Sequence, residues 1–588
     1  MNKNTQSLKE IFLSATASYK KKDFKNAEIL CFKVLSIDSN HFDTIYLLAT
    51  LNAIKRDFKK AKELMMKAVT IQPKNKAALN NLGTAYKELG MIKEAMETFK
   101  KILKIDENHI NANYNIGLSF YSLRELQKAK KYLQKTVNLQ DNYAIAYYSL
   151  GNVHYELKEM KEAMSCYQKA IEINPKIFNA YNHLGLVYRE LNDFQNSINS
   201  YLKSIEVNPS NPNAYHNLAE VYKETGNFKK SIECNEITIK HEPNNLMSYY
   251  SLCELKKDYL NSELKKKIEK IINDKKTSLH NLAYGYYLLA KYERLGKNYK
   301  KEFEYLIKGH KNFYESKKEK FDLGIKYCFD DVLQIEKNIN VNKISTKSKI
   351  SLKPIFIFGV PRCGSTLVEK IIGSGKNYIP SGEEIGVIGG YVISKVLEME
   401  SLNLGSSKEI SNELFEIYKN RGLVFEKYNY MFTDKSLDNF FYLKLIKEIY
   451  PSAKFVHCKR NLLSSIVSIF QNNLTILAWA HNLDNIFKYF DNYLKIVENY
   501  SRLNPDSIYN LNFEELINNP EEESKKLMNY CELPWDKKCL EFYKRKDLFS
   551  KTASNIQIRK GIYKHSNDKY APYKKILEKY QKKYSWFN

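Results

Sequence analysis

Small and apolar positions recur every 34 residues through the first part of the chain. Two registers of this period hold small residues, one with Gly83, Gly117, Gly151 and Gly185 beside Ala49 and Ala219, the other with Ala27, Ala61, Ala95, Ala129 and Ala163 followed by Ser197 and Ser231. A third register holds Pro73, Pro175, Pro209 and Pro243. Small residues let two helices cross closely, and a proline ends a helix because it lacks the amide proton. The pattern predicts about seven helix pairs between Leu8 and Asn245.

A 34-residue helix pair with aromatic residues near its small positions, here Tyr86, Tyr188 and Tyr222, resembles the tetratricopeptide repeat. The resemblance implies an α-solenoid over residues 8–245 with a concave groove. Such grooves usually hold peptides or partner proteins. We therefore expect this part to recruit an acceptor or a protein partner for the rest of the chain.

The hydrophobic pattern changes after Asn245. Residues 246–339 remain helical by pattern but lose the 34-residue signature, which predicts a helical extension of the solenoid. Residues 340–352 are polar and without apolar periodicity, as in a linker. From 353 to 588, short apolar runs alternate with helical stretches. This predicts an α/β domain with a central, mainly parallel sheet and a ligand at the carboxyl ends of the strands.

The charge of the chain narrows its partners only slightly. The 588 residues carry a formal net charge of +26, which suits nucleic acid, an anionic membrane surface or an acidic acceptor. The lysines are nevertheless spread along the whole chain, and no arginine-aromatic nucleic-acid module is visible. We expect no specific nucleic-acid partner.

The start of the chain, its apolar runs and its cysteines bear on where the protein is located. The start, MNKNTQSLKEIF, lacks the charged-then-apolar pattern of a signal peptide, and no run reaches the roughly 18 apolar residues of a membrane span. Nine scattered cysteines without framework spacing indicate reduced thiols. The expectation is a cytoplasmic protein with no membrane span.

The chemistry concentrates in Pro354–Glu384, which reads as an apolar strand, a glycine loop and a helix that opens on hydroxyls. Unpaired amides in the first turn and the helix dipole favour a phosphate beside Gly364, Ser365 and Thr366. Gly359–Thr366 follows the G-x-x-x-x-G-K-[ST] phosphate-loop pattern, except that Ser365 replaces the lysine. This difference disfavours an ordinary kinase or ATPase.

The loop PRCGSTLVE resembles instead the 5′-phosphosulfate loop of sulfotransferases, which move a sulfuryl group from 3′-phosphoadenosine 5′-phosphosulfate (PAPS). The resemblance nominates Arg362, Cys363, Gly364, Ser365 and Thr366 as donor-binding residues. Cys363 enters as a member of the loop and not as a nucleophile, because the local sequence supplies no base partner.

Four further motifs, in order along the chain, extend the resemblance to the bacterial-type and protein-tyrosine sulfotransferases from about Lys353 to Tyr580. The SGEE segment supplies the general base in the protein-tyrosine enzymes, which favours Glu384 and leaves Glu383 as the alternative. The FTDKSLDNFF segment nominates Lys435 as the residue near the transferring sulfuryl group. An arginine and a hydroxyl eight residues later, Arg460 and Ser468, resemble the 3′-phosphate site.

The last motif, SKTASNIQIRKGIY, resembles the C-terminal adenosine-phosphate segment and nominates Ser554 and Lys560, with Arg559 as an alternate. One motif departs from the family. Where relatives commonly have Tyr-Glu-(Asp/Gln)-Leu, this chain begins the box with Phe513, so a phenol hydroxyl is missing. That puts one nucleotide contact in doubt.

Together these residues imply a PAPS-dependent sulfotransferase that acts by in-line transfer, with a glutamate base and Lys435 neutralising the leaving oxygen. The scheme needs no metal. The acceptor hydroxyl stays open among a peptide tyrosine, a glycan and a metabolite. The alternatives are a non-catalytic nucleotide-binding repeat scaffold and, with less support, a P-loop kinase.

Overall fold

The computed structural model describes residues 3–342, 352–376, 379–399, 402–545, 547–562 and 570–587. The chain divides into two compact units, Met1–Ala214 and Tyr215–Asn588. Most of the predicted linker 340–352 lies outside the described residues, as does Tyr563 at the end of the last motif. The first three linker residues form a short strand, β1 (Asn340–Asn342).

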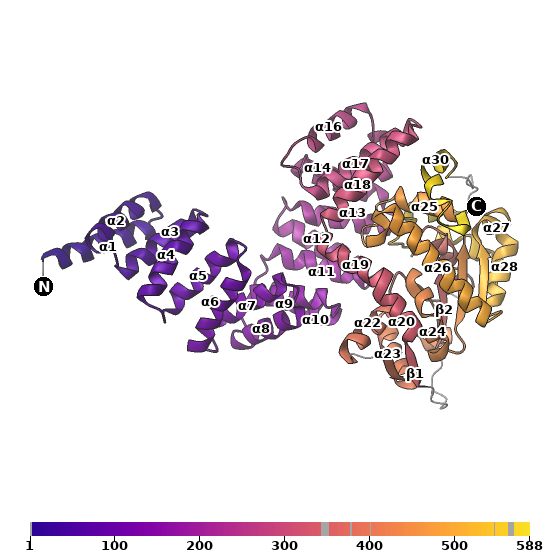
Figure 1. Cartoon of the computed structure of the whole chain (residues 1–588), viewed down its shortest axis with the longest axis horizontal. Helices are drawn as coiled ribbons and strands as arrows, with labels where there is room; N and C mark the ends of the chain where they lie inside the picture. The colour runs from indigo at the N-terminus through magenta and orange to yellow at the C-terminus, as the bar shows by residue number, and fades with distance from the viewer. Residues whose placement is uncertain are drawn as a thin grey trace. The chain divides into compact units, whose positions relative to one another are not determined.

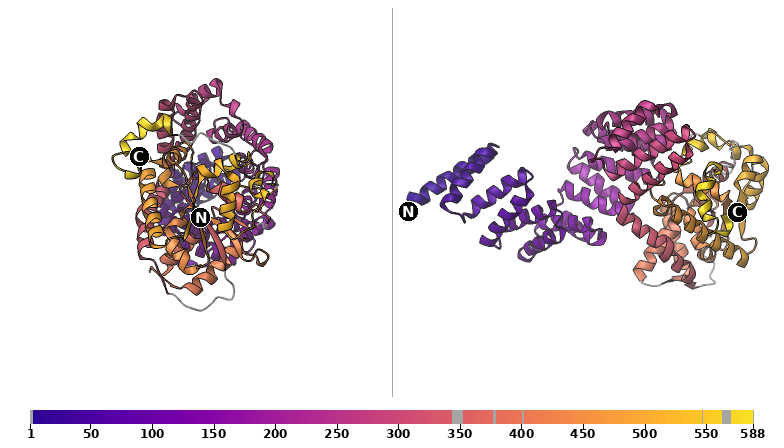
Figure 2. Two further views of the ribbon diagram at one scale, coloured as in Figure 1. Left: turned by 90° about the vertical axis from the view of Figure 1, so that its right-hand side faces the viewer. Right: turned by 45° about the horizontal axis from the view of Figure 1, so that its top comes forward.

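Antiparallel helix pairs make up the first unit, as the ribbon shows (Figure 1), and a second view shows the same pairing (Figure 2). The helices are α1 (Lys3–Lys20), α2 (Phe24–Ile37), α3 (Phe42–Ile54), α4 (Phe58–Ile71), α5 (Lys76–Glu88), α6 (Ile92–Ile105), α7 (Ile110–Ser122), α8 (Leu126–Leu139), α9 (Ala144–Glu156), α10 (Met160–Ile173), α11 (Phe178–Glu190) and α12 (Phe194–Val207). The predicted α-solenoid is confirmed.

The small residues of the 34-residue period sit where the two helices of a pair touch. A Cβ added at Gly151 would lie 2.7 Å from the ring of Tyr167, and one added at Gly185 would lie 2.7 Å from the ring of Tyr201. Each large ring on the second helix thus fills the space that the glycine leaves on the first. This explains why the period is visible in the sequence.

The turn inside each pair has a repeating backbone. One residue per turn has a positive φ, at Lys22, Arg56, Gly90, Arg124, Lys158, Asn192 and Gly226, all 34 residues apart. In several turns the following residue caps the second helix, as Asp57 does by accepting from the amide of Lys60. The prolines stand just beyond the second helix, as at Pro73 after α4, and help to end it.

The second unit opens with more helices, followed by the α/β part. They are α13 (Pro212–Glu224), which crosses the division between the units, α14 (Phe228–His241), α15 (Leu246–Leu255), α16 (Ser262–Ile272), α17 (Leu279–Leu295), α18 (Tyr299–Glu315), α19 (Lys318–Lys326) and α20 (Val332–Asn338). One hydrophobic core runs from Leu246 to Phe587. The predicted helical extension therefore shares its core with the α/β part. Buried polar contacts join the two as well: His310 Nε2 lies 2.7 Å from the Phe470 carbonyl, and Tyr573 donates to Glu302 at 2.6 Å.

A five-stranded parallel sheet forms the centre of the α/β part, in the order β3-β5-β2-β6-β7. Its strands are β2 (Lys353–Phe358), β3 (Ser381–Glu383), β5 (Met431–Lys435), β6 (Lys454–Lys459) and β7 (Ile508–Asn512), while β4 (Asn403–Ser406) pairs with β1. Central strand β2 is buried after its first residue, as expected for a strand covered on both faces. The predicted α/β domain with a parallel sheet is confirmed.

Helices connect these strands and follow the last of them. They are α21 (Ser365–Ile372), α22 (Val387–Met399), α23 (Ser407–Asn420), α24 (Leu443–Ile449), α25 (Leu462–Phe470), α26 (Leu483–Leu503), α27 (Phe513–Asn518), α28 (Pro520–Tyr530), α29 (Asn555–Ile558) and α30 (Lys574–Leu577). Across the described ranges, no helix combines the length and the apolar character that a membrane crossing requires.

Candidate functional site

The predicted site residues gather at the carboxyl edge of the sheet. Strand β2 runs into the glycine loop before α21, β3 ends at Glu383, β5 ends at Lys435, and β6 ends just before Arg460. The chain leaves β2 first toward β3 and β5 and later toward β6 and β7, so β2 marks a reversal of strand order. Ligands of open parallel sheets bind at such a switch point, beyond the carboxyl ends of the strands.

The glycine loop is shaped by close packing. Gly364 caps α21 with a φ of 100°, and a Cβ there would lie 2.3 Å from the ring of Phe513. Phe513, the residue that departs from the family box, therefore supports the loop that cradles the predicted anion. Ser365 and Thr366 begin the helix and are buried. Their first-turn amides are the groups expected to bind an anion.

Cys363 is fully buried beneath this loop and lies beside Cys458 at the end of β6. A Cβ added at Gly359 would meet both the Cys363 sulfur and the Cys458 carbonyl at 2.7 Å. Hydrogen bonding from the Cys458 thiol lowers the pKa of Cys363 despite burial, and it raises the pKa of Cys458. The buried thiol supports the loop from below.

Arg362 contacts polar side chains from α25 and from the C-terminal part. Its φ is 71°, and its guanidinium donates to Ser468 at 3.2 Å, Ser554 at 2.8 Å and Gln557 at 3.1 Å. Arg460 Nη1 donates to the Arg362 carbonyl at 2.8 Å. The structure thus brings together four of the predicted donor-binding residues, from the loop, α25 and the C-terminal part.

Arg460 is also stacked. Its guanidinium carbon lies 4.7 Å from the centre of the Phe513 ring, so the aromatic residue that replaces the family tyrosine contacts both the loop and this arginine. Burial lowers the pKa of Arg460, with Glu514 opposing that effect. A guanidinium held by a ring presents its fork in a fixed direction.

The two candidate bases have different surroundings. Glu384 follows β3 with a φ of 54°, its side chain is 35% exposed, and it accepts from Lys435 Nζ at 2.7 Å. The side chain of Glu383 is 1% exposed and lies 3.6 Å from both Lys435 and Lys370. Glu384 is therefore open to solvent, whereas Glu383 is enclosed.

Glu369 and Lys370 of α21 complete a buried charge cluster around Lys435. Lys370 contacts Glu369 at 3.3 Å, and the hydroxyl of Thr433 donates to Glu369 at 3.0 Å. Burial opposes the charge of Lys435, but Glu384, Glu383 and Glu369 together raise its pKa above the ordinary value. Burial likewise disfavours ionised Glu383, yet Lys370 and Lys435 hold its pKa below the ordinary range.

Residues 550–559, the C-terminal strap, run from this cluster to Arg362. At one end, Ser550 donates to Glu383 at 2.9 Å and the Lys551 amide donates to Glu383 at 3.3 Å. Thr552 contacts Thr366 of α21 at 3.2 Å. Ser554 then reaches Arg362, as described above. The strap therefore touches both the charge cluster and the loop.

The remaining predicted residues of this segment lie apart from Arg362. Arg559 donates to the backbone carbonyls of Glu224 and Leu548, at 2.8 and 2.7 Å. Lys560 is exposed to solvent. Neither side chain is among those that Arg362 contacts.

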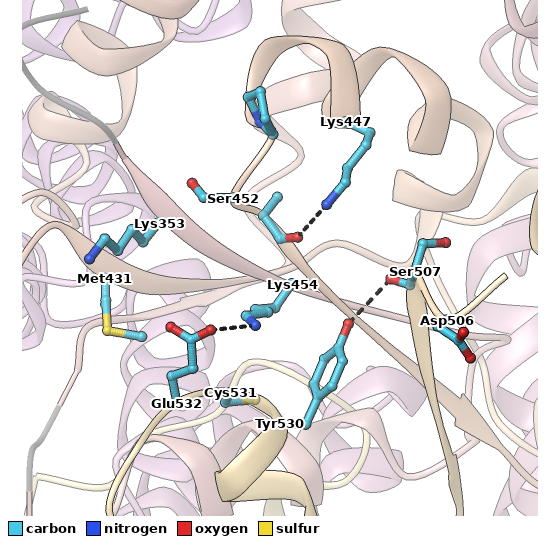
Figure 3. Close-up of a pocket in the computed structure, with 12 residues that line it drawn as sticks. Lys353, Met431, Lys447, Ser452, Lys454, Asp506, Ser507, Tyr530, Cys531 and Glu532 are labelled. Atoms are coloured by element: carbon cyan, nitrogen blue, oxygen red, sulfur yellow. Dashed lines mark hydrogen bonds and ion pairs between the residues drawn. The ribbon is translucent and has the colours of Figure 1, made fainter. Parts of the chain in front are cut away.

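A separate hollow lies at the opposite edge of the sheet (Figure 3). Its lining includes Lys353, Met431 and Lys454, which are the first residues of β2, β5 and β6. In it, Lys454 pairs with Glu532 at 2.7 Å. This hollow is therefore at the amino ends of the strands and does not include the predicted site residues.

Gln557, Glu369 and Lys370 were missed by sequence reasoning. Gln557 lies three residues after Ser554 in the strap, so its position in the same motif was the available signal. Lys370 and Glu369 offered no signal, because an acidic and a basic residue in a helix usually face solvent. Among the described residues, no group of three or more His, Cys, Asp or Glu side chains is arranged to hold a metal ion.

Comparisons with known proteins agree with both predicted parts. The model of the sulfotransferase family matches residues 354–537. Tetratricopeptide repeat models match residues 42–75, 77–109, 110–143, 144–177, 166–198 and 185–226. The chain thus contains tetratricopeptide repeats and, after them, a sulfotransferase family domain.

The relatives cover parts of the chain. A protein of Aquifex aeolicus (strain VF5), described as uncharacterized, is 31% identical over 326 residues, which are 53% of this chain. This chain covers 42% of that relative's length.

Similar solved structures match the helical part. The crystal structure of MamA is 27% identical, covers 28% of this chain and 95% of its own, and has a TM-score of 0.27. YrrB, described as a TPR protein with an unusual peptide-binding site, is 19% identical, with 32% and 98% covered and a TM-score of 0.29. The C-terminal part of a TPR repeat-containing protein from Cytophaga hutchinsonii is 18% identical, with 41% and 99% covered and a TM-score of 0.34.

Proposed function

We propose that this chain, which joins tetratricopeptide repeats to a sulfotransferase family domain, transfers a sulfuryl group from PAPS to an acceptor hydroxyl. The observation that carries the proposal is the meeting, at one edge of the sheet, of an anion loop, two arginines and a glutamate–lysine pair. The general sulfotransferase activity follows from the matched family. The donor, the base and the acceptor are our inference.

The donor set fits PAPS. The first turn of α21 suits the 5′-phosphosulfate, because the N–H groups and the positive end of the dipole at a helix N-terminus favour an anion. Arg362 is assigned to the 5′-phosphosulfate with the loop amides, and Arg460 and Ser468 to the 3′-phosphate that distinguishes PAPS from ATP. Arg362 donates to Ser468 at 3.2 Å and so links the two proposed subsites. Arginine offers phosphate a planar, two-pronged donor. Ser554 completes the set through its contact with Arg362.

Glu384 is assigned as the general base. It accepts the proton of the attacking hydroxyl while the acceptor oxygen forms its bond to sulfur and the bond from sulfur to the bridging oxygen breaks. The bridging oxygen keeps the electron pair of the broken bond. Lys435, whose Nζ lies 2.7 Å from Glu384, neutralises the negative charge that develops there. Glu383 is assigned a supporting role, because its carboxylate is enclosed and occupied by Lys370, Lys435 and the strap.

The same features argue against the two alternatives. A P-loop kinase needs the lysine that Ser365 replaces. A non-catalytic scaffold has no need to keep Glu384 against a buried lysine at the mouth of an anion loop. We therefore retain the scaffold only as the reading that a failed transfer assay would favour.

The wider proposal concerns partners and location. The repeats are assigned to the recruitment of a peptide or protein, which includes a hydroxyl acceptor such as a peptide tyrosine, while a glycan or a metabolite fits the same base. A cytoplasmic location is proposed because all nine cysteines are free thiols, as in a reducing compartment.

Transfer of radioactive sulfate from [³⁵S]PAPS tests the proposal. Wild type and Glu384→Gln are incubated with tyrosine peptides, oligosaccharides and small phenols, and labelled products are separated and counted. We expect label on one acceptor class with wild type and a loss of about 100-fold or more with Glu384→Gln. Equal labelling by both proteins would remove Glu384 from the role of base, and no labelling of any class would favour the scaffold.

A further inference from the structure

The turn between α13 and α14 differs from its counterparts in the other repeats. At its register, five of seven residues are Lys, Arg or Asn with a positive φ, so this left-handed position accepts side chains in this protein. Glycine stands only at Gly90 and Gly226 within that register. Backbone conformation alone therefore does not require glycine at either place.

Space distinguishes the two glycines. A Cβ added at Gly90 would find nothing within 4 Å. One added at Gly226 would lie 2.4 Å from Cζ and 2.5 Å from Nη1 of Arg559. The absent side chain at position 226 thus lets the guanidinium of the C-terminal strap approach the turn.

Arg559 docks on the end of a helix. Glu224 is the last residue of α13, and its carbonyl accepts from Arg559 Nη2 at 2.8 Å, Asn555 Nδ2 at 3.2 Å and the Ser550 amide at 3.3 Å. Carbonyls at a helix C-terminus lack partners within the helix and carry the negative end of its dipole. A cationic donor is therefore well placed there.

The same guanidinium also holds the strap in shape. Arg559 Nε donates to Asn555 Oδ1 at 3.1 Å, and Nη2 donates to the Leu548 carbonyl at 2.7 Å. Ser554 and Gln557 lie in the sequence between Leu548 and Arg559, and both accept hydrogen bonds from Arg362. Arg559 therefore fixes the segment that presents two side chains to the central arginine of the donor site.

We propose that Arg559 is a positioning residue for donor binding, which clasps the C-terminal strap to the end of α13 and so holds Ser554 and Gln557 against Arg362. The proposal rests on the proposed function, because it takes Arg362 to contact the donor. Its consequence is that the turn Glu224–Gly226, which lies in a repeat and outside the proposed donor-binding residues, contributes to donor affinity. A change at this turn is coupled to the donor site.

The matched pair Gly226→Ala and Gly90→Ala tests this in the full-length chain. Both place a methyl group on the same left-handed position of a repeat, but only Gly226→Ala displaces the Arg559 guanidinium, which is the movable end of a flexible side chain. We measure the Kd of 3′-phosphoadenosine 5′-phosphate (PAP) by calorimetry. We expect a rise of about 10-fold for Gly226→Ala and less than about 2-fold for Gly90→Ala.

Hydrogen exchange of residues 550–559, measured without ligand, is a second readout. It reports local opening of the C-terminal strap, which a measurement of global stability does not show. We expect faster exchange there in Gly226→Ala and unchanged exchange in Gly90→Ala. Arg559→Lys, which keeps the charge but loses the fork that joins two carbonyls and Asn555, is expected to behave like Gly226→Ala.

The outcomes separate this proposal from the proposed function. Faster exchange with weaker PAP binding supports the clasp as a positioning device. Unchanged PAP affinity in Gly226→Ala and Arg559→Lys overturns the proposal, whatever the exchange shows, and so does weaker binding with unchanged exchange. A wild-type protein that binds no PAP refutes the proposed function, and exchange then decides whether the clasp itself exists.

Discussion

Replacing Glu383 and Glu384 one at a time by glutamine should affect stability to different extents, because the two side chains have different environments. Glu383 has a side chain that is 1% exposed and lies 3.6 Å from each of two buried lysines. Glu384 is 35% exposed and has one lysine partner. We expect Glu383→Gln to lower the free energy of unfolding more than Glu384→Gln does.

The magnitude follows from the contacts. Removing one partner of a buried ion pair costs about 3–5 kcal/mol, because the other charge stays buried. Lys370 keeps Glu369 at 3.3 Å and Lys435 keeps Glu384 at 2.7 Å, so the lower end, about 3 kcal/mol, applies to Glu383→Gln. Glu384→Gln leaves the buried Lys435 with Glu383 at 3.6 Å, but Glu384 itself is 35% exposed and screened by water, so its loss should cost less, about 1–2 kcal/mol.

Urea unfolding followed by tryptophan fluorescence measures the difference, since the tryptophans lie in the second unit. Because the pKa of Glu383 is lowered on folding, the stability it contributes is complete above its unfolded pKa of about 4.3 and disappears as the pH falls through its lower folded value. The gap between wild type and Glu383→Gln should therefore close in acid. A larger loss in Glu384→Gln than in Glu383→Gln, or a gap that persists in acid, would refute the reasoning.

Three further predictions concern binding, pH and the repeats. Arg460→Ala should weaken PAP binding by about 10- to 150-fold, which is the effect of losing one hydrogen bond to a charged group. The affinity for 5′-AMP should change little. Equal losses for both nucleotides in calorimetry would contradict the assignment of Arg460 to the 3′-phosphate. Burial lowers the pKa of both His310 and His457 to about 4. Protonation of each ring should therefore lower the free energy of unfolding by about 3 kcal/mol as the pH falls from about 6.5 to about 4. A urea midpoint that does not change across that range would be inconsistent with neutral buried rings. Gly185→Ala places a methyl group 2.7 Å from the ring of Tyr201 and should destabilise the repeats by about 1–3 kcal/mol in a circular-dichroism melt, an expectation that an unchanged melt would overturn.

The fold was largely predictable from the sequence because its determinants are local and periodic. A glycine such as Gly151 opposes a ring such as Tyr167 in the same 34-residue unit, so the packing repeats wherever the spacing does. The strand, loop and helix around Gly364 were likewise visible, since the apolar run and the glycines lie within a few residues of one another.

The sequence predicted which residues belong to the candidate site better than it predicted which of them contact one another. The motifs nominated Arg362, Ser468 and Ser554. The fold brings them together although Ser468 and Ser554 lie more than 100 and more than 190 residues after Arg362 in the sequence. The buried partner Lys370 was not predictable, because its burial depends on how α21 meets β3. The docking of Arg559 on Glu224 joins residues 335 apart, and no local pattern encodes such a contact.

The division of roles between the two glutamates also needed three-dimensional information. Glu383 and Glu384 are adjacent and chemically equivalent in the sequence, so only the position of β3 beside β5 separates them. Glu383 pairs in register with Lys435 and turns inward, whereas Glu384 adopts a left-handed conformation beyond the strand.

Calorimetric titration of the full-length protein with PAP, and in parallel with 5′-AMP and Mg·ATP, tests whether the site at the carboxyl edge of the sheet binds a PAPS-type nucleotide. PAP and 5′-AMP differ only by the 3′-phosphate that we assign to Arg460 and Ser468. We expect PAP to bind at least about 10-fold more tightly than 5′-AMP, since each charged hydrogen bond contributes about 1.5–3 kcal/mol, and Mg·ATP to bind no better than 5′-AMP. Equal affinity for PAP and 5′-AMP, or binding of Mg·ATP alone, would contradict it.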